Sequence, residues 1–141
     1  MNPRIVVDAS VAVKWLIAEE HSGLAEALSG RQMIAPALLL IECGNALLRR
    51  ARMGDLPADT VVRKVRALRI APLRLVPAEQ HLDAAITLAT QLRHSLYDCL
   101  YLALALVERV QLITADQRFV ERVRRDGRLA GSVILLTETS H

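Results

Sequence analysis

Short apolar runs alternate with longer helical patterns along the whole chain of 141 residues. Brief runs rich in Val, Ile and Leu are typical of buried strands, whereas apolar residues spaced by three and four indicate helices. We expect strands at residues 5–7, 32–35, 73–76, 111–114 and 132–136, and helices at 10–18, 21–28, 36–52, 55–71, 79–92, 96–107 and 116–125. Such alternation favours a parallel sheet. The sequence therefore predicts one α/β domain, residues 1–141, with helices on both faces of the sheet.

The composition is that of a folded globular protein with a mildly basic surface. Hydrophobic residues make up 52% of the chain and the net charge is +3. The only lysines are Lys14 and Lys64, and all other basic residues are arginines, which bind phosphate through paired hydrogen bonds. This bias fits a nucleic-acid partner and fits an ordinary solvated surface equally well. The four aromatic residues are too few for a base-stacking surface.

Neither the N-terminal segment nor the rest of the chain indicates a membrane protein. No apolar run approaches the ~20 residues that cross a bilayer, and residues 1–8 lack the long apolar stretch of a signal peptide. Cys43 and Cys99 show no metal-binding spacing, so we expect buried, reduced thiols. We therefore expect a cytoplasmic protein with no membrane partner.

Two aspartates follow predicted strands. Asp8 ends the first strand, and Asp116 comes shortly after the strand at 111–114. Ligands of open α/β sheets bind beyond the carboxyl ends of the strands, where the strand order reverses. If these two strands are neighbours, their separation of ~5 Å brings both carboxylates to one crevice.

A third acid, Glu42, lies within the apolar helical stretch 38–48. This stretch is apolar nearly all round, so we expect it to be largely buried. A buried carboxylate without a partner costs several kcal/mol or takes up a proton. Asn45, three residues further on, shares its helix face and is a candidate to orient it. The alternatives are an ion pair with an arginine or a solvated edge.

Asp98 has two interpretations. The sequence Ser95-Leu96-Tyr97-Asp98 has the form of a capping box, in which Asp98 only caps its helix. The following segment, 99–107, carries no charge, so the helix is expected to be buried. A carboxylate at the N-terminus of a buried helix stays ionised beside the helix dipole and is suited to bind a cation.

Four converging carboxylates would repel one another, and a divalent cation would relieve that repulsion. Oxygen ligands select Mg²⁺ or Mn²⁺ rather than zinc, and no histidine is expected at the site. Ser10 and Thr114 are close in sequence to Asp8 and Asp116, and their hydroxyls can support these ligands. Ser10 as an N-cap and Thr114 as a plain strand residue are equally compatible with the sequence.

Four ordered motifs resemble those of PIN-domain proteins, and more narrowly the VapC toxins of toxin–antitoxin pairs. They are Val6-Val7-Asp8-Ala9-Ser10, Glu42 in its apolar helix, Tyr97-Asp98-Cys99-Leu100-Tyr101-Leu102-Ala103 and Leu112-Ile113-Thr114-Ala115-Asp116-Gln117-Arg118-Phe119. The similarity extends over essentially the whole chain. Some members carry a further acidic or amide residue shortly after the fourth acid. Here Gln117-Arg118-Phe119-Val120 follow, which leaves the number of metal ions open.

The resemblance implies a five-stranded parallel sheet of order 3-2-1-4-5 and an acidic quartet of Asp8, Glu42, Asp98 and Asp116. Asp8 and Asp98 would be the firmest metal ligands, Asp116 would complete the site, and Glu42 would bind metal or orient the attacking water. The implied activity is Mg²⁺-dependent endonucleolytic cleavage of RNA. A small VapB-like antitoxin would be the partner, and homodimerisation is usual.

The arginines nearest these motifs are Arg93 and Arg118, which are candidates to steer the phosphates of RNA or ordinary surface charges. A phospho-receiver domain is disfavoured because neither lysine ends a late strand, and a haloacid-dehalogenase-type phosphatase because Ser10 stands where a second Asp is needed. The serious alternative is a non-catalytic PIN module that binds an antitoxin and helps it to repress DNA.

Overall fold

The sheet is parallel throughout, and its strand order is β3-β2-β1-β4-β5. The computed structural model describes residues 4–139. The strands are β1 (Ile5–Val7), β2 (Met33–Pro36), β3 (Leu73–Val76), β4 (Gln111–Thr114) and β5 (Val133–Leu135). In the centre, Val6 pairs with Ile34 on one side and Leu112 on the other. The expected fold class and strand order are confirmed. We expected no signal peptide in residues 1–8, and the first three residues of this segment lie outside the described residues.

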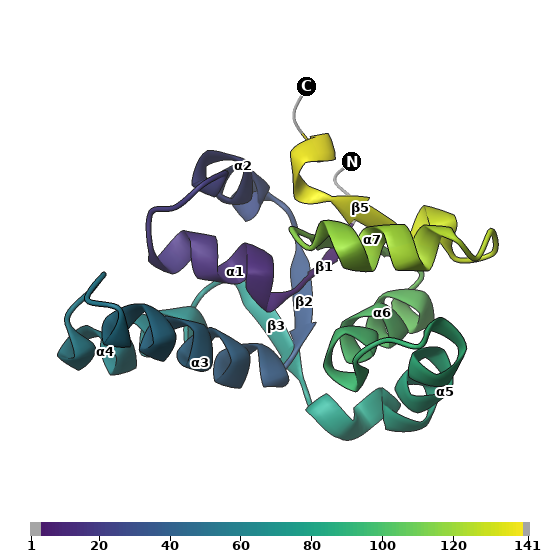
Figure 1. Cartoon of the computed structure of the whole chain (residues 1–141), viewed down its shortest axis with the longest axis horizontal. Coiled ribbons are helices and arrows are strands. Elements are labelled where there is room, and N and C mark those ends of the chain that lie inside the picture. Colours follow the sequence, from purple (N-terminus) through teal and green to yellow (C-terminus); the bar gives the residue numbers. More distant parts are fainter. Residues whose placement is uncertain (1–3, 140–141) are drawn as a thin grey trace.

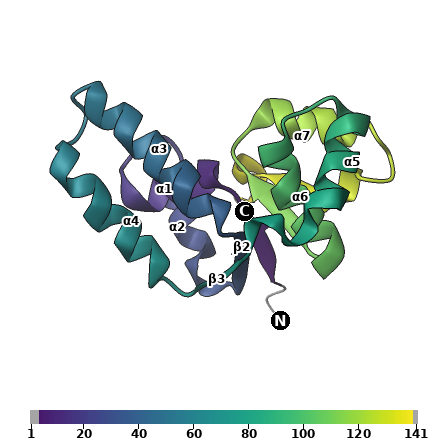
Figure 2. The same ribbon diagram turned by 90° about the horizontal axis from the view of Figure 1, so that it is seen from below.

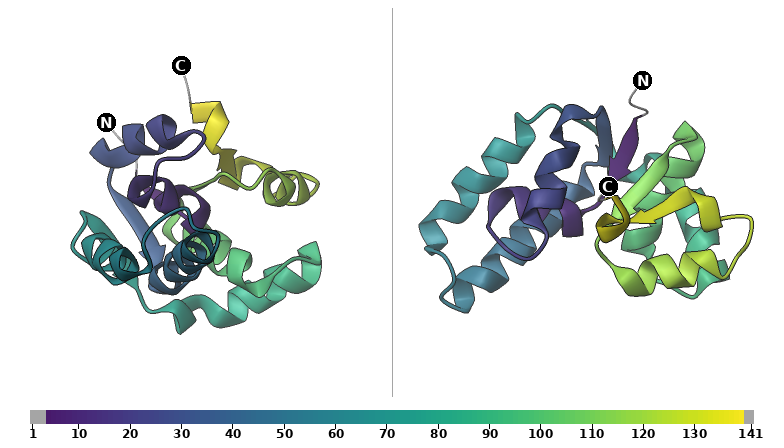
Figure 3. Two further views of the ribbon diagram at one scale, coloured as in Figure 1. Left: turned by 60° about the vertical axis from the view of Figure 1, so that its left-hand side comes forward. Right: turned by 90° about the horizontal axis from the view of Figure 1, so that it is seen from above.

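Among residues 4–139, seven α-helices cover the two faces of the sheet in two groups, which Figures 1 and 2 show from two sides. One group is α1 (Ala9–Leu16), α2 (Ser22–Glu26), α3 (Leu38–Arg52) and α4 (Val61–Arg69), and the other is α5 (Leu82–Leu92), α6 (Leu96–Glu108) and α7 (Gln117–Arg124). Figure 3 shows the same separation from two further sides. Right-handed crossovers explain it, because the chain first adds strands towards β3 and then returns towards β5. The strand order reverses between β1 and β4.

The ends of several elements differ from the predicted ones. The helix expected from residue 36 begins at Leu38, because Pro36 is the last residue of β2 and pairs with Val76. The expected helix at 21–28 is α2 followed by the 3₁₀ turn Ala27–Gly30. The cap of α1 is Asp8 rather than Ser10, since the Asp8 side chain accepts a hydrogen bond from the Val11 backbone.

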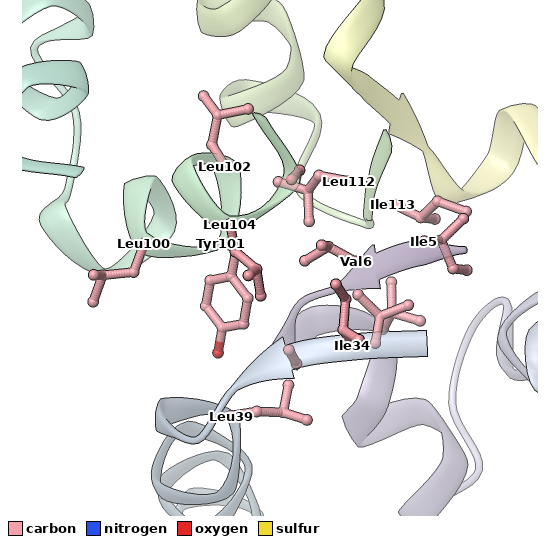
Figure 4. Packing of buried hydrophobic residues seen from close by; sticks show 14 of the residues in the cluster. Ile5, Val6, Ile34, Leu39, Leu100, Tyr101, Leu102, Leu104, Leu112 and Ile113 are labelled. Atoms are coloured by element: carbon pink, nitrogen blue, oxygen red, sulfur yellow. The ribbon is translucent and has the colours of Figure 1, made fainter. Parts of the chain in front are cut away.

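The core is centred on α6, which contacts β1, β2 and β4. All residues from Cys99 to Ala105 are buried and belong to the core cluster that also contains the side chains of the central strands, part of which Figure 4 shows. Cys43 and Cys99 are both buried and unpaired, as expected. Within residues 4–139, no helix combines the length and the apolar character needed to cross a membrane.

Helix α3 is less buried than its composition predicts. Leu39, Cys43 and Leu47 face inwards, but Ile41 is 71% exposed and Leu48 is 41% exposed. The expectation that residues 38–48 are largely buried is wrong, because α3 packs beside α1 and α4 and leaves one face in solvent. The same helix thus presents Glu42 to the interior and an apolar stripe to the outside.

Candidate metal centre

The acidic residues from the first and fourth strands meet where the strand order reverses. β1 and β4 are direct neighbours, with Val7 opposite Ile113, and Asp8 follows β1 immediately. Asp116 lies two residues beyond β4 and caps α7, its Oδ1 accepting from the Phe119 backbone at 3.1 Å. The prediction that these two strands are neighbours is confirmed. Both acids therefore lie at the edge of an open α/β sheet where ligands bind.

Hydrogen bonds join the ends of these two strands around Asp8. The Ser10 hydroxyl donates to Asp8 Oδ1 at 2.5 Å, while its oxygen accepts from the Ala115 backbone at 2.9 Å. Ser10 Oγ also lies 3.3 Å from Thr114 Oγ1, which accepts from the Asp116 backbone at 3.1 Å. Ser10 and Thr114 therefore support the Asp8 carboxylate and the backbone at Ala115 and Asp116.

Asp8 lies in an environment that disfavours its negative charge. Its side chain is buried, with 5% of the residue exposed. This burial raises the pKa of Asp8 to about 7, although hydrogen bonds from Ser10, Thr114 and Val11 work in the opposite direction. The nearby charge of Asp98 raises it further. A carboxylate with so little solvation is stabilised by a cation that binds beside it.

Glu42 is held by a tyrosine that the sequence did not single out. The Tyr101 hydroxyl, on α6, donates to Glu42 Oε1 at 2.5 Å, and Figure 4 shows this hydroxyl at the end of a ring that points towards α3. Burial raises the pKa of Glu42, and the charge of Asp98 adds to that shift. Asn45 was the residue expected to orient Glu42, but the hydrogen bond to the Glu42 carboxylate comes from Tyr101.

Asp98 does not complete the capping box suggested by its motif. Ser95 caps α6 by accepting from the Tyr97 backbone, whereas Asp98 Oδ2 lies 2.6 Å from His94 Nε2. Burial raises the pKa of Asp98, the His94 contact lowers it, and the charge of Asp116 raises it. The Asp98 carboxylate thus pairs with His94, just before the start of α6, and lies within the influence of the Asp116 charge.

Asp98 is the electrostatic centre of the group. Its charge raises the pKa of both Asp8 and Glu42, and its own pKa is raised by Asp116. Ligand atoms of Asp98, Asp116 and His94 lie within 4.8 Å of one another, a grouping that can hold a metal ion. The structure therefore brings Asp98 and Asp116 together with His94, and Asp8 and Glu42 interact with Asp98 through their charges.

None of these four carboxylates forms a salt bridge to a lysine or arginine among residues 4–139. A group of partly or fully buried carboxylates without lysine or arginine partners repels itself, and a divalent cation relieves this repulsion. Carboxylate oxygens are the ligands that Mg²⁺ and Mn²⁺ accept. The donor set and its surroundings therefore fit a divalent cation.

A cleft of about 580 Å³ opens beside this acidic group, between α1 and α3. Ser10, Glu42, Asn45 and Ala115 line its end nearest the acids. The far end contains three basic residues; Lys14 and Arg50 both pair with Glu19, whereas Arg49 forms no salt bridge within the described residues.

The two arginines predicted to steer phosphate do not line this cleft. Arg93 ends α5 in the left-handed conformation, with φ of 52°, and its carbonyl accepts from Arg122 at 2.8 Å. Arg118 is exposed in the first turn of α7. Their contact with RNA stays a prediction.

Two residues of this group, His94 and Tyr101, are absent from the sequence-based prediction. A tyrosine within an uncharged buried helix needs a partner for its hydroxyl, and this need could have indicated Tyr101. His94 gave a weaker signal, because it lies outside α6 and helical spacing does not place it beside Asp98.

The sheet is parallel, and an acidic pocket that fits a cation lies where its strand order reverses. These two features define a class of α/β proteins with a metal site. Within that class, the model of the PIN domain family matches residues 5–125. The chain belongs to the PIN domain family.

The chain is 36% identical over 121 residues to Ribonuclease VapC1 from two strains of Mycobacterium tuberculosis, CDC 1551 / Oshkosh and ATCC 25618 / H37Rv. Each alignment covers 80% of this chain and 86% of the relative.

Solved structures share the fold at lower sequence identity. PAE2754 from Pyrobaculum aerophilum aligns with a TM-score of 0.73 and 19% identity, covering 96% of this chain and 90% of that one. VapBC2 from Rickettsia felis, bound to a DNA fragment from their promoter, aligns with a TM-score of 0.63 and 14% identity. A toxin–antitoxin complex from Klebsiella pneumoniae aligns with a TM-score of 0.62 and 13% identity. These last two alignments each cover 94% of this chain and 97% of the other.

Proposed function

We propose that this protein is a metal-dependent endoribonuclease and the toxin of a toxin–antitoxin pair. The observation that carries the proposal is the group of Asp8, Glu42, Asp98 and Asp116, whose charges interact and which form no salt bridge to a lysine or arginine among residues 4–139. The 36% identity to a ribonuclease supports the activity. In the proposed site, Asp8, Asp98 and Asp116 hold Mg²⁺ or Mn²⁺, and Glu42 binds metal or orients the attacking water.

The residues around the acids have separate tasks in this mechanism. Ser10 and Thr114 hold Asp8 and the start of α7 in place, and Tyr101 fixes Glu42 Oε1 so that the other oxygen is free to accept from water. Asn45 lines the cleft next to Glu42. A bound divalent cation supplies charge neutralisation at the phosphate and lowers the pKa of a water ligand.

The RNA is proposed to enter through the cleft between α1 and α3. This cleft leads from Glu42 towards Arg49, whose guanidinium forms no salt bridge within residues 4–139 and is suited to pair with a phosphate. Arg93 and Arg118 are proposed to contact RNA outside the cleft.

A VapB-like antitoxin and a second copy of the chain are the proposed protein partners. The structural similarity to two toxin–antitoxin complexes supports the antitoxin. Exposed apolar side chains on α3 and α4, among them Ile41, Leu48, Val62 and Ile70, provide a surface for protein contact. Size-exclusion chromatography with light scattering, on the chain alone and with its antitoxin, measures both assemblies.

The activity is tested by incubating the purified chain with RNA in the presence of Mg²⁺ or Mn²⁺, with and without EDTA. We expect internal cleavage that EDTA abolishes and added metal restores, because the buried acids cannot by themselves activate water beside a phosphate. Antitoxin binding without any RNA cleavage, under either metal, would instead select the non-catalytic, repressor-supporting module.

Metal is expected to stabilise the fold even without RNA. An ion that binds only the native state adds about 2.7 kcal/mol at a concentration a hundred times its Kd. At roughly 3 °C per kcal/mol for a domain of this size, the melting temperature should rise by about 8 °C. Thermal unfolding monitored by circular dichroism measures this shift, with K⁺ at matched ionic strength as the control. An unchanged curve would exclude a preformed metal site.

A further inference from the structure

His94 belongs to the acidic group by geometry, although the sequence indicated no histidine there. Its Nε2 lies 2.6 Å from Asp98 Oδ2, and its ligand atom is within 4.8 Å of those of Asp98 and Asp116. The side chains of His94 and Asp98 are 18% and 27% exposed, so both are largely shielded while remaining reachable from solvent. This is the position of a ligand rather than of a surface histidine.

The fold holds the imidazole ring between two helices. His94 lies in the short connection from α5 to α6, where its backbone N–H donates to the Ala89 carbonyl at 3.2 Å. Its ring stacks on Phe119, with centroids 4.6 Å apart and planes 25° from parallel. Phe119 is fully buried, and its backbone N–H donates to Asp116 Oδ1. One residue, Phe119, therefore positions both the imidazole and the carboxylate of Asp116.

The spacing of these groups suits a shared ion. Ligand atoms on one ion with bonds of about 2.1 Å are about 3.0 to 4.2 Å apart, and the three ligand atoms here lie within 4.8 Å of one another, so small side-chain rotations would bring all three to one ion. In the absence of an ion, the 2.6 Å contact between His94 and Asp98 is a hydrogen bond through a shared proton. Both atoms of that bond are lone-pair donors that a cation can use in place of the proton.

We propose that His94 is a ligand of the divalent cation, together with Asp98 and Asp116, and that its nitrogen makes the site prefer Mn²⁺ over Mg²⁺. Imidazole binds transition-metal ions, whereas Mg²⁺ favours oxygen ligands and water. Mn²⁺ prefers carboxylate oxygens as Mg²⁺ does, but as a transition-metal ion it takes an imidazole nitrogen more readily than Mg²⁺, so of the two it suits two carboxylates and one imidazole better. This inference rests on the proposed function, because it concerns the same metal site, and it corrects the expectation that no histidine takes part.

The direct test is pulsed electron paramagnetic resonance of Mn²⁺ bound to the full chain. A coordinated imidazole gives a ¹⁴N modulation, which must change to a ¹⁵N pattern in protein labelled with ¹⁵N-histidine. We expect this signal in the wild type and in the control His81→Gln, whose histidine lies outside the site, and not in His94→Gln. The wild-type measurement needs no variant, so a folding defect in His94→Gln cannot decide it.

Ion affinities give the second measurement. We expect His94→Gln to weaken Mn²⁺ binding by at least about 100-fold, because removal of a group that only supports a metal ligand already costs about 10- to 100-fold. Mg²⁺ affinity, measured by competition against Mn²⁺, should change by less than about threefold, and His81→Gln should leave both unchanged. Circular dichroism melting of each variant without metal checks that the fold is retained.

Several results would overturn the proposal. Bound Mn²⁺ without nitrogen modulation would show that His94 only orients Asp98, and an equal loss of Mn²⁺ and Mg²⁺ affinity would show the same. Absence of Mn²⁺ binding would also reject it. The proposed nuclease fails by a different result, namely no EDTA-sensitive RNA cleavage, so RNA cleavage without nitrogen modulation would reject only the role of His94.

Discussion

Replacing Asp8 or Asp98 by Asn is expected to abolish RNA cleavage while leaving the fold intact. Each change removes one negative charge but keeps the shape of the side chain, so the core around α6 is unaffected. Loss of a group that only supports a metal ligand reduces activity by 10- to 100-fold, and loss of a ligand should cost at least about 100-fold. Cleavage of a labelled RNA under single-turnover conditions measures the effect.

The matched control is Asp83→Asn, which makes the same chemical change on the exposed surface of α5. This variant should cleave RNA at the wild-type rate, and its melting curve should be unchanged. Full activity of Asp98→Asn would remove Asp98 from the metal site and leave it as the partner of His94 at the start of α6. Full activity of Asp8→Asn would contradict the proposed mechanism as a whole.

The stability of the metal-free protein is expected to fall as the pH rises from about 4 to about 7. Burial raises the pKa of Asp8 from 3.8 to about 7, so the folded state holds a proton that the unfolded chain releases. The stabilising contribution is therefore complete below pH 3.8 and lost as the pH rises through about 7. At about 1.4 kcal/mol per pH unit, this difference amounts to at most about 4 kcal/mol.

Asp8→Asn separates this effect from other titrations. Asn cannot ionise, so the variant should unfold at higher denaturant concentration than the wild type at pH 8 in EDTA, and the two should converge near pH 4. In Asp8→Asn, the dependence of the unfolding free energy on pH should become weaker without vanishing, because the pKa values of Asp98 and Glu42 are also raised. Cys43 and Tyr101, which also interact with Asp8, stay protonated across this range.

Urea unfolding at several pH values measures both proteins, and Asp83→Asn again serves as the control. Equal stability of Asp8→Asn and the wild type at pH 8 would show that Asp8 is better solvated than its burial indicates. We expect Asp8→Asn to be inactive and, without metal, more stable than the wild type. This combination is expected when the charge of a residue is needed for activity and destabilises the fold.

Hydrophobic periodicity is a local property, and the elements that it predicts are those the structure contains. The buried strand Ile5–Val7, the strand Gln111–Thr114 and the uncharged helix Leu96–Glu108 were all apparent from the order of apolar residues. The positions of Asp8 and Asp116 after their strands were visible for the same reason. Because parallel strands end at one edge of the sheet, their convergence could be predicted once the two strands were taken as neighbours.

Partners distant in the chain could not be predicted in this way. Glu42 and Tyr101 are 59 residues apart, and their hydrogen bond depends on how α3 and α6 pack against the sheet. His94 and Asp98 are only four residues apart, but His94 precedes α6, so their pairing depends on the turn between α5 and α6 and on the distant ring of Phe119. The exposed side of α3, with Ile41 and Leu48, likewise results from packing that composition does not reveal.

The sequence by itself determined which segments form strands and helices and which acids follow the strands, because side-chain pattern controls burial one element at a time. Only the tertiary structure decided which groups surround those acids. In the folded chain an imidazole and a phenol contact the carboxylates, and no lysine or arginine among residues 4–139 forms a salt bridge with them. Only the tertiary structure decides this, because side-chain partners and desolvation arise only where separate elements pack together.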